Sequence, residues 1–152
     1  MAGQYTATVT VSDEDGGTSA SVSATLTLNY TIVGGGILQP INQDGSSVFK
    51  YKSTIPVKLK VTDCNGSTPG TLTIKIMLTQ LSGNAPGVDI NEPFSTSAAD
   101  TTGFLRFTGS PDYQYLYNLA TKSLPDPSAI YKITLTIMQT LQTIAVNFGL
   151  KP

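Results

Sequence analysis

The chain has 152 residues, of which 12% are charged, and its nine basic and ten acidic side chains leave a net charge of −1. It contains no histidine, no tryptophan and one cysteine, Cys64. Without histidine there is no Ser-His-Asp triad, Cys-His dyad or HExxH zinc site, and a single cysteine makes neither an internal disulfide nor a cysteine-based zinc site. The near-neutral charge also argues against nucleic-acid binding.

The sequence shows no sign of membrane insertion. Its start lacks a basic segment followed by an apolar run, and no stretch reaches the roughly 18 apolar residues that indicate a membrane-spanning helix. A composition rich in Thr, Ser and Gly and poor in charge is nevertheless typical of extracellular bacterial β-modules. We therefore expect a piece of a longer secreted or surface protein, with intracellular assembly in a virion as the competing explanation.

The first part of the chain alternates between apolar and hydroxyl-bearing residues. This period of two runs over residues 5–11 and again over 22–32, and it predicts two strands, each with one apolar and one wet face. The acids and paired glycines between them predict a loop. The two strands form either a hairpin or consecutive strands of a sandwich. Gly34, Gly35 and Gly36 follow, and we expect them to be a hinge between a module at 1–33 and one at 37–152.

Beyond the glycines the alternation predicts short strands and no helix. Pro56 lacks a backbone donor, so it belongs at a strand start or on an edge strand, and Asn65-Gly66 predicts a hairpin turn. Residues 82–103 read as irregular, apart from a short strand near 88–90. The fold class predicted is all-β, an immunoglobulin-like antiparallel β-sandwich preceded by a two-stranded segment. The other expected strands cover residues 37–41, 47–51, 55–61, 72–78, 104–108, 113–118, 130–138 and 144–150.

A local pattern around Tyr131 supports the sandwich. Residues 124–131 read LPDPSAIY, which places this tyrosine at the start of a long strand just after a proline-rich corner. In a tyrosine corner the hydroxyl bonds to upstream backbone and pins the loop between sheets. We therefore expect a structural role for Tyr131.

Two stretches resemble known families. Residues 5–30 resemble the closing two strands of a PKD (polycystic kidney disease) domain in their aromatic-strand-D-x-D-G-G-strand form, and they cover about the final third of such a domain. Residues 37–151 are similar to a C-terminal module of bacterial secreted proteins called after its PxKF motif. The resemblance implies a non-enzymatic extracellular accessory module without catalytic residues. The matching segments are IPVKL at 55–59, DCNG at 63–66, EPFSTS at 92–97, YLYNL at 115–119 and VNFGL at 146–150.

One candidate site is acidic. Asp13, Glu14 and Asp15 offer hard oxygen ligands to Ca²⁺, which takes six to eight such ligands. Some PKD domains are similar in binding Ca²⁺ near domain junctions. The alternative is a solvated turn, and no other cofactor is expected.

A second candidate site is aromatic. Tyr113, Tyr115 and Tyr117 share one face of a predicted strand and could stack on sugar rings if they were exposed. The favoured alternative is that they fill the core, because large aromatic side chains are mostly buried. The thiol of Cys64 is expected to be a packed loop group, and catalysis is not expected because no spacing singles out a carboxylate pair.

The apolar face of residues 5–32 points to self-association. A lone hairpin is marginally stable in water at best, so this face must pack on the second module or complete a sheet in a neighbouring copy. The leading functional hypothesis is a non-catalytic extracellular structural or assembly module whose partners are other copies or other modules of its parent protein. The rivals are a carbohydrate-binding or adhesive module with glycan partners and a phage or virion decoration domain.

Overall fold

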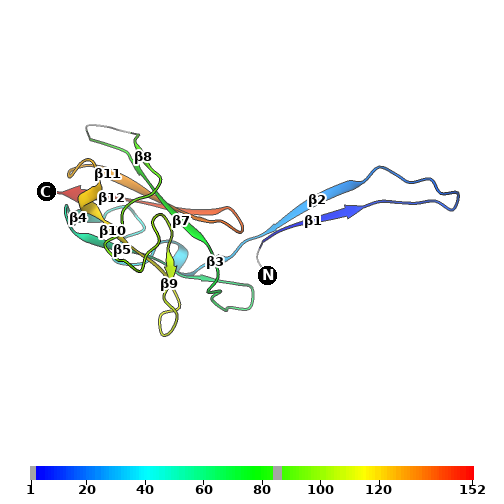
Figure 1. Ribbon diagram of the computed structural model, residues 1–152, viewed down its shortest axis with the longest axis horizontal. Helices are drawn as coiled ribbons and strands as arrows, with labels where there is room; N and C mark the ends of the chain where they lie inside the picture. Colours follow the sequence, from blue (N-terminus) through cyan, green and yellow to red (C-terminus); the bar gives the residue numbers. More distant parts are fainter. Residues whose placement is uncertain (1–2, 84–86) are drawn as a thin grey trace.

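The computed structural model describes residues 3–83 and 87–152. A sandwich of strands forms the body, and a long hairpin projects from one end of it (Figure 1). Two 3-10 turns, Val33–Gly35 and Thr121–Ser123, are the helical elements of the described residues, and the remaining elements are strands. The all-β prediction is therefore confirmed.

The larger sheet of the body has five strands in the order β4-β12-β11-β7-β8. Its neighbours are antiparallel except at one edge, where β4 runs parallel to the end of β12. This one parallel pair is an exception within the predicted antiparallel sandwich. The parallel pairing is possible because the chain crosses the body between the two strands. The strands are β4 Val48–Lys50, β7 Ile74–Gln80, β8 Asp89–Ile90, β11 Ile130–Ile137 and β12 Gln142–Lys151.

The smaller sheet has three strands in the order β5-β10-β9, where β5 is Thr54–Leu59, β10 is Tyr115–Ala120 and β9 is Arg106–Phe107. Pro56 lies on β5, an edge strand, opposite Asn118 of β10. Its missing N–H therefore removes no bond from the interior of the sheet. A further two-stranded ladder joins β3 (Thr31–Ile32) to β6 (Val61–Thr62).

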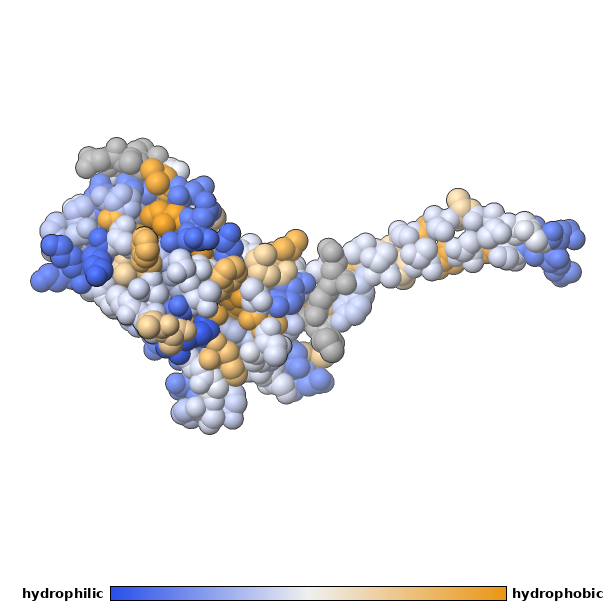
Figure 2. Space-filling view, in the orientation of Figure 1, coloured by the Kyte–Doolittle hydropathy of each residue, from blue (hydrophilic) through white to orange (hydrophobic). Residues whose placement is uncertain are grey.

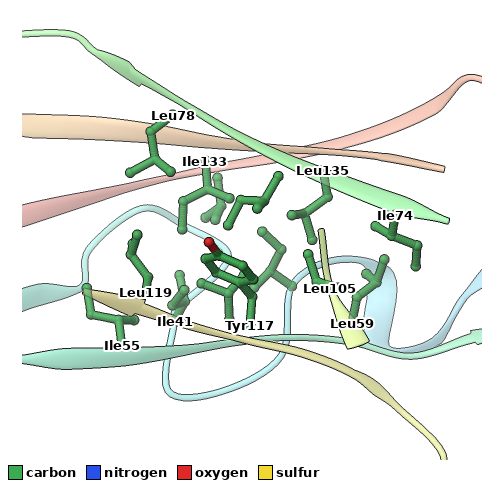
Figure 3. Packing of buried hydrophobic residues seen from close by; sticks show 14 of the residues in the cluster. Ile41, Ile55, Leu59, Ile74, Leu78, Leu105, Tyr117, Leu119, Ile133 and Leu135 are labelled. Atoms are coloured by element: carbon green, nitrogen blue, oxygen red, sulfur yellow. The ribbon is translucent and has the colours of Figure 1, made fainter. Parts of the chain in front are cut away.

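The core lies between the two sheets (Figure 3). Alternate residues of β5, β7, β10 and β11 point inward and are fully or almost fully buried. The last two long strands pair as the sequence predicted, with Ile133 opposite Val146 and Leu135 opposite Ile144. Burial of this continuous apolar layer is the main favourable contribution to folding of the body.

Residues 37–41 do not form the predicted strand. Ile37 and Ile41 are buried, but the segment makes only an isolated bridge between Leu38 and Lys58. Pro40 interrupts the row of backbone donors that a ladder needs. Apolar side chains from an irregular segment fill the core here without a ladder.

The hairpin separates from the body at Asn29, before the glycines. Tyr30 is already in the core, and its backbone N–H and C=O both bond to the side-chain amide of Gln142, at 3.1 and 3.0 Å. Gly34 lies within a 3-10 turn at φ 74°, and Gly36 is buried. The three glycines thus shape a turn inside the body.

Candidate interaction surface

The projecting hairpin, residues 3–28, is called the arm below. Its strands are β1 (Gly3–Val9) and β2 (Val22–Leu28), and they pair with each other in antiparallel register. Beyond Val9 and Val22 the two segments of the hairpin stay joined, because Ser19 N–H donates to the Val11 carbonyl and Val11 N–H donates to the Ser19 hydroxyl. The arm is therefore a hydrogen-bonded ribbon up to its tip.

One side of the arm is apolar and exposed. The register places Ala7 opposite Ala24 and Val9 opposite Val22, with Leu26 next to them on the same side. Val9, Val22 and Leu26 remain 62%, 71% and 59% exposed. This surface, formed by Ala7, Val9, Val22, Ala24 and Leu26, is called the arm's apolar face. Full burial of a Val or Leu side chain is worth roughly 1.5–3 kcal/mol relative to full exposure, and these side chains retain more than half of that possible gain.

The opposite side of the arm is lined with hydroxyl groups. Thr8 and Ser23 form a cross-strand hydroxyl bond of 2.9 Å, and Thr10 and Ser21 form one of 3.3 Å. These groups bond to one another and to water equally well, so this side loses nothing by staying exposed. The two sides of the arm thus differ in what they gain from a partner.

The tip of the arm is a turn that Asp13 closes. The Asp13 carboxylate accepts the N–H groups of Asp15 and Gly17, at 3.1 and 2.6 Å, and so closes the turn. Within residues 3–83 and 87–152, no three Asp, Glu, His or Cys side chains come close enough to hold a metal ion. The candidate Ca²⁺ ligands Asp13, Glu14 and Asp15 are therefore not gathered around a common point in the described structure.

Charge is divided unevenly between the arm and the body. The arm holds three carboxylates and no basic residue, so its charge is −3. The body holds all nine basic residues and seven acidic ones, which gives it a charge of +2. Figure 2 shows the hydrophilic tip at the far end of the arm, well away from the body.

The three tyrosines of the aromatic candidate site do not form an exposed stripe. Tyr115 and Tyr117 are buried in the core, as the favoured alternative predicted. Tyr113 lies before β10 at φ 47° and is 47% exposed. It lines a hollow of about 440 Å³ together with Lys60, Thr62, Gly66, Ser67 and Thr68. A sugar-stacking stripe is excluded because only one of the three rings reaches solvent.

Buried tyrosine hydroxyls hold loops in three places. Tyr131 donates to the Asp126 carbonyl at 3.0 Å and accepts the Asp126 N–H at 2.9 Å. Tyr115 donates to Pro69 O and accepts Leu72 N–H. Tyr117 similarly donates to the Pro93 carbonyl and accepts the N–H of Gly103. The sequence predicts a loop-holding role for Tyr131 alone. Each of the three bonded loops contains a proline, and this shared feature could have indicated the other two tyrosines.

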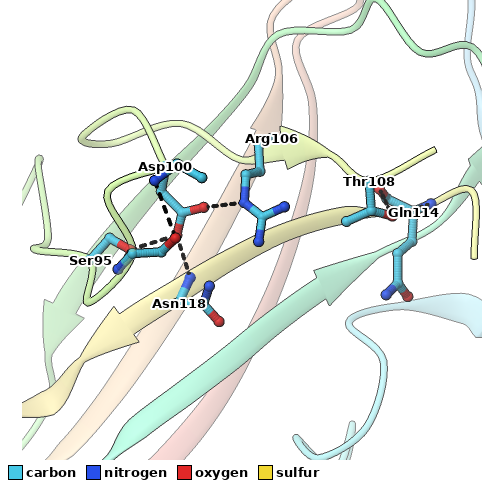
Figure 4. A network of polar contacts seen from close by, with 8 residues as sticks. Ser95, Asp100, Arg106, Thr108, Gln114 and Asn118 are labelled. Atoms are coloured by element: carbon cyan, nitrogen blue, oxygen red, sulfur yellow. Dashed lines mark hydrogen bonds and ion pairs between the residues drawn. The ribbon is translucent and has the colours of Figure 1, made fainter.

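A buried carboxylate organises the irregular segment beside β10 (Figure 4). The Asp100 side chain is fully buried and accepts Arg106 Nε at 2.6 Å. Its other oxygen accepts the Ser95 hydroxyl at 2.5 Å and the Asn118 N–H at 2.8 Å. The carboxylate thus satisfies a β10 donor that a neighbouring strand would otherwise satisfy. Its bonds are those of a structural group.

Two further observations concern reactive groups and membranes. Cys64 is exposed and unpaired, so the prediction of a packed loop thiol is wrong. It lies in a tight turn in which Asp63 accepts the N–H groups of Asn65 and Ser67, and this turn leaves the thiol on the outside.

Among the described residues, no helix has the length and apolar character needed to cross a membrane.

The chain was compared with models of protein families and with curated proteins. No protein-family model matches the chain, and no curated protein matches it.

Proposed function

We propose that this chain is a non-catalytic structural module of a bacterial secreted or surface protein, and that it self-associates through the arm. The observation that carries the proposal is the exposed apolar face of a hydrogen-bonded two-stranded ribbon. A ribbon of this kind is marginally stable alone and gains stability when a partner covers it. The resemblance to PKD and PxKF modules supports the same extracellular, non-enzymatic role.

The proposal is tested with arm variants of the full chain. Val22→Gln/Leu26→Gln makes the apolar face polar, and Ser23→Gln/Thr25→Gln makes a matched change on the hydroxyl side of the same strand. Sedimentation velocity over a range of protein concentrations should show association of the wild type and the control, and a monomer for the apolar-face variant. A wild type that stays monomeric at every concentration contradicts the proposal.

A second candidate function is carbohydrate binding at the hollow beside Tyr113. A half-exposed aromatic ring next to hydroxyl groups and Lys60 offers a stacking surface and hydrogen-bonding groups for a small polar ligand. The test is a glycan array probed with the wild type and Tyr113→Ala. Retained glycan binding by the variant, or no binding by the wild type, contradicts this function.

A further inference from the structure

We infer that the arm of one copy docks on the outer side of the five-stranded sheet of a second copy, at the end where the chain terminates. This inference rests on the proposed function and names the surface that receives the arm. That surface, called the acceptor face below, consists of the apolar residues Val48, Leu81, Ile130 and Gly149 with the flanking lysines Lys50, Lys132 and Lys151.

The acceptor face begins with an apolar row that runs across four neighbouring segments. Gly149 of β12 lies opposite Val48 of β4 on one side and Ile130 of β11 on the other. Leu81 N–H bonds to the Ile130 carbonyl and extends the row past the end of β7. Val48, Ile130 and Leu81 are 55%, 46% and 42% exposed. Gly149 has no side chain, so the surface of the row is depressed between the side chains of Val48 and Ile130.

Lysines border this row on both sides. Lys50 and Lys151 are paired in the next outward-facing position toward the end of β12. Lys132, two residues beyond Ile130 on β11, faces outward on the other side of the row. Lys52 and Lys122 lie at the same end of the body, where the Tyr51 hydroxyl bonds to the Lys122 carbonyl. On the Lys132 side two carboxylates are also near, Asp89 beside Thr79 and Asp44 in the loop beside Asn147. The basic border is therefore the one that Lys50 and Lys151 form. An apolar row with this basic border fits an apolar ribbon with an acidic tip.

The lengths of the two surfaces show where the acidic tip would lie on the acceptor face. Asp13 is four residues beyond Val9, which is about 13 Å along an extended strand. Lys151 is two residues beyond Gly149, about 7 Å along β12. Lys50 is paired with Lys151, and the turn that contains Lys52 follows Lys50. An arm that lies along the strands with Val9 and Val22 on the apolar row therefore carries its carboxylates past Lys151.

The arm does not reach the acceptor face of its own chain. Its root is held at Gln142, the first residue of β12, whereas the apolar row crosses β12 at Gly149. These positions are about 23 Å apart along the strand, and the arm points away from the body (Figure 1). The occupant is therefore a second copy. Because the donating and receiving surfaces differ, the contact is heterologous, and copies join head to tail.

Charge reversal in the full chain tests the acceptor face. Glu14→Lys/Asp15→Lys reverses the tip and leaves Asp13 to close the turn, and Lys50→Glu/Lys151→Glu reverses the border of the row. Sedimentation velocity at low ionic strength should show at least tenfold weaker association for either pair of substitutions. The chain that carries all four should recover, because its tip and border are again opposite in charge. Lys58→Glu/Lys75→Glu, a matched charge change on β5 and at the other end of β7, should associate like the wild type.

The apolar row is tested separately from its charge. Ile130→Gln should weaken association, whereas Thr134→Gln, at an outward position further along β11, should not. If acceptor-face variants associate like the wild type while Val22→Gln/Leu26→Gln is monomeric, the arm docks elsewhere, such as on a strand edge or on another arm. That result overturns this inference and leaves the proposed function standing. A monomeric wild type overturns both. Circular dichroism of each variant confirms that it retains the β structure.

Discussion

The buried tyrosines show how single side chains replace secondary structure in this fold. Each hydroxyl of Tyr115, Tyr117 and Tyr131 both donates to and accepts from the backbone of a loop. The loop groups would otherwise be buried without partners, which costs about 1–3 kcal/mol for each group. One ring therefore fixes a loop and fills part of the core at the same time.

Removing one of these hydroxyls should destabilise the body. Tyr131→Phe keeps the ring in the core but leaves the N–H and C=O of Asp126 without this partner. We expect the free energy of unfolding to fall by about 1–3 kcal/mol, measured by urea denaturation. Tyr113→Phe, at an exposed ring, serves as the control and should change it by less than about 0.5 kcal/mol. Equal stability of the two variants would contradict the loop-holding role.

Alkaline pH should unfold the body through the same residues. Burial raises the pKa of the Tyr115, Tyr117 and Tyr131 hydroxyls above their ordinary value of 10.0. Above that pH the unfolded chain releases these protons while the folded chain retains them, so the unfolded state becomes favoured. Stability should therefore be intact below about pH 10 and should fall as pH rises toward the folded pKa values. Urea midpoints between about pH 7 and pH 11, followed together with tyrosinate absorbance, measure this loss.

At the level of elements, the root of the arm depends on a contact between distant parts of the chain. The Gln142 amide bonds to both backbone groups of Tyr30, as a neighbouring strand would. This contact holds Tyr30, which lies two residues beyond the end of the arm at Leu28, against the start of β12. Gln142 is 112 residues from Tyr30, so no local sequence pattern indicates this contact.

Loss of this contact should loosen the root and leave the sandwich folded. Gln142→Ala removes both bonds, and we expect faster amide hydrogen exchange at Tyr30 and in β1 and β2, with exchange in β11 unchanged. Gln139→Ala is the matched control, because Gln139 makes one exposed bond to Thr73 N–H. Equal exchange at Tyr30 in the two variants would show that other contacts hold the arm.

The sequence predicts an element well when the pattern that forms it lies within that element, and poorly when the element depends on contacts with distant residues. The alternation in β1, β2, β11 and β12 is a property of each strand, so both their existence and the apolar side of the arm were predictable. Residues 37–41 were misassigned because burial of Ile37 and Ile41 needs contact with the core and not a ladder. The acceptor row was missed because its members come from four segments that only the strand register brings together.

At the scale of the whole molecule, the protein is elongated and its two ends carry different surfaces. The arm, with its acidic tip and apolar face, projects from one end (Figure 1). The acceptor face lies where β12 ends, at the other end of the body. Attraction between opposite charges at exposed surfaces is screened by salt, with a Debye length near 10 Å at about 0.1 M. Burial of apolar surface is not screened in this way. Salt should therefore weaken the association of the wild type in part. It should strengthen that of Glu14→Lys/Asp15→Lys, whose tip has the same sign of charge as the lysines of the acceptor face.

Mixing experiments should reveal whether assembly is head-to-tail. A copy with Val22→Gln/Leu26→Gln cannot donate its arm, but its acceptor face is intact and still receives an arm from a wild-type copy. Such a copy ends a growing row, so an equal amount of it should lower the mean mass of wild-type assemblies in light scattering. If the arms instead paired with each other in a symmetric dimer, this variant would not bind the wild type and the size of the wild-type assembly would not change. A chain that carries Val22→Gln/Leu26→Gln together with Lys50→Glu/Lys151→Glu cannot donate its arm and also receives an arm only weakly, so it should have little effect on the mixture. Shortening by the first variant and not by the second would show that each copy donates at one end and receives at the other.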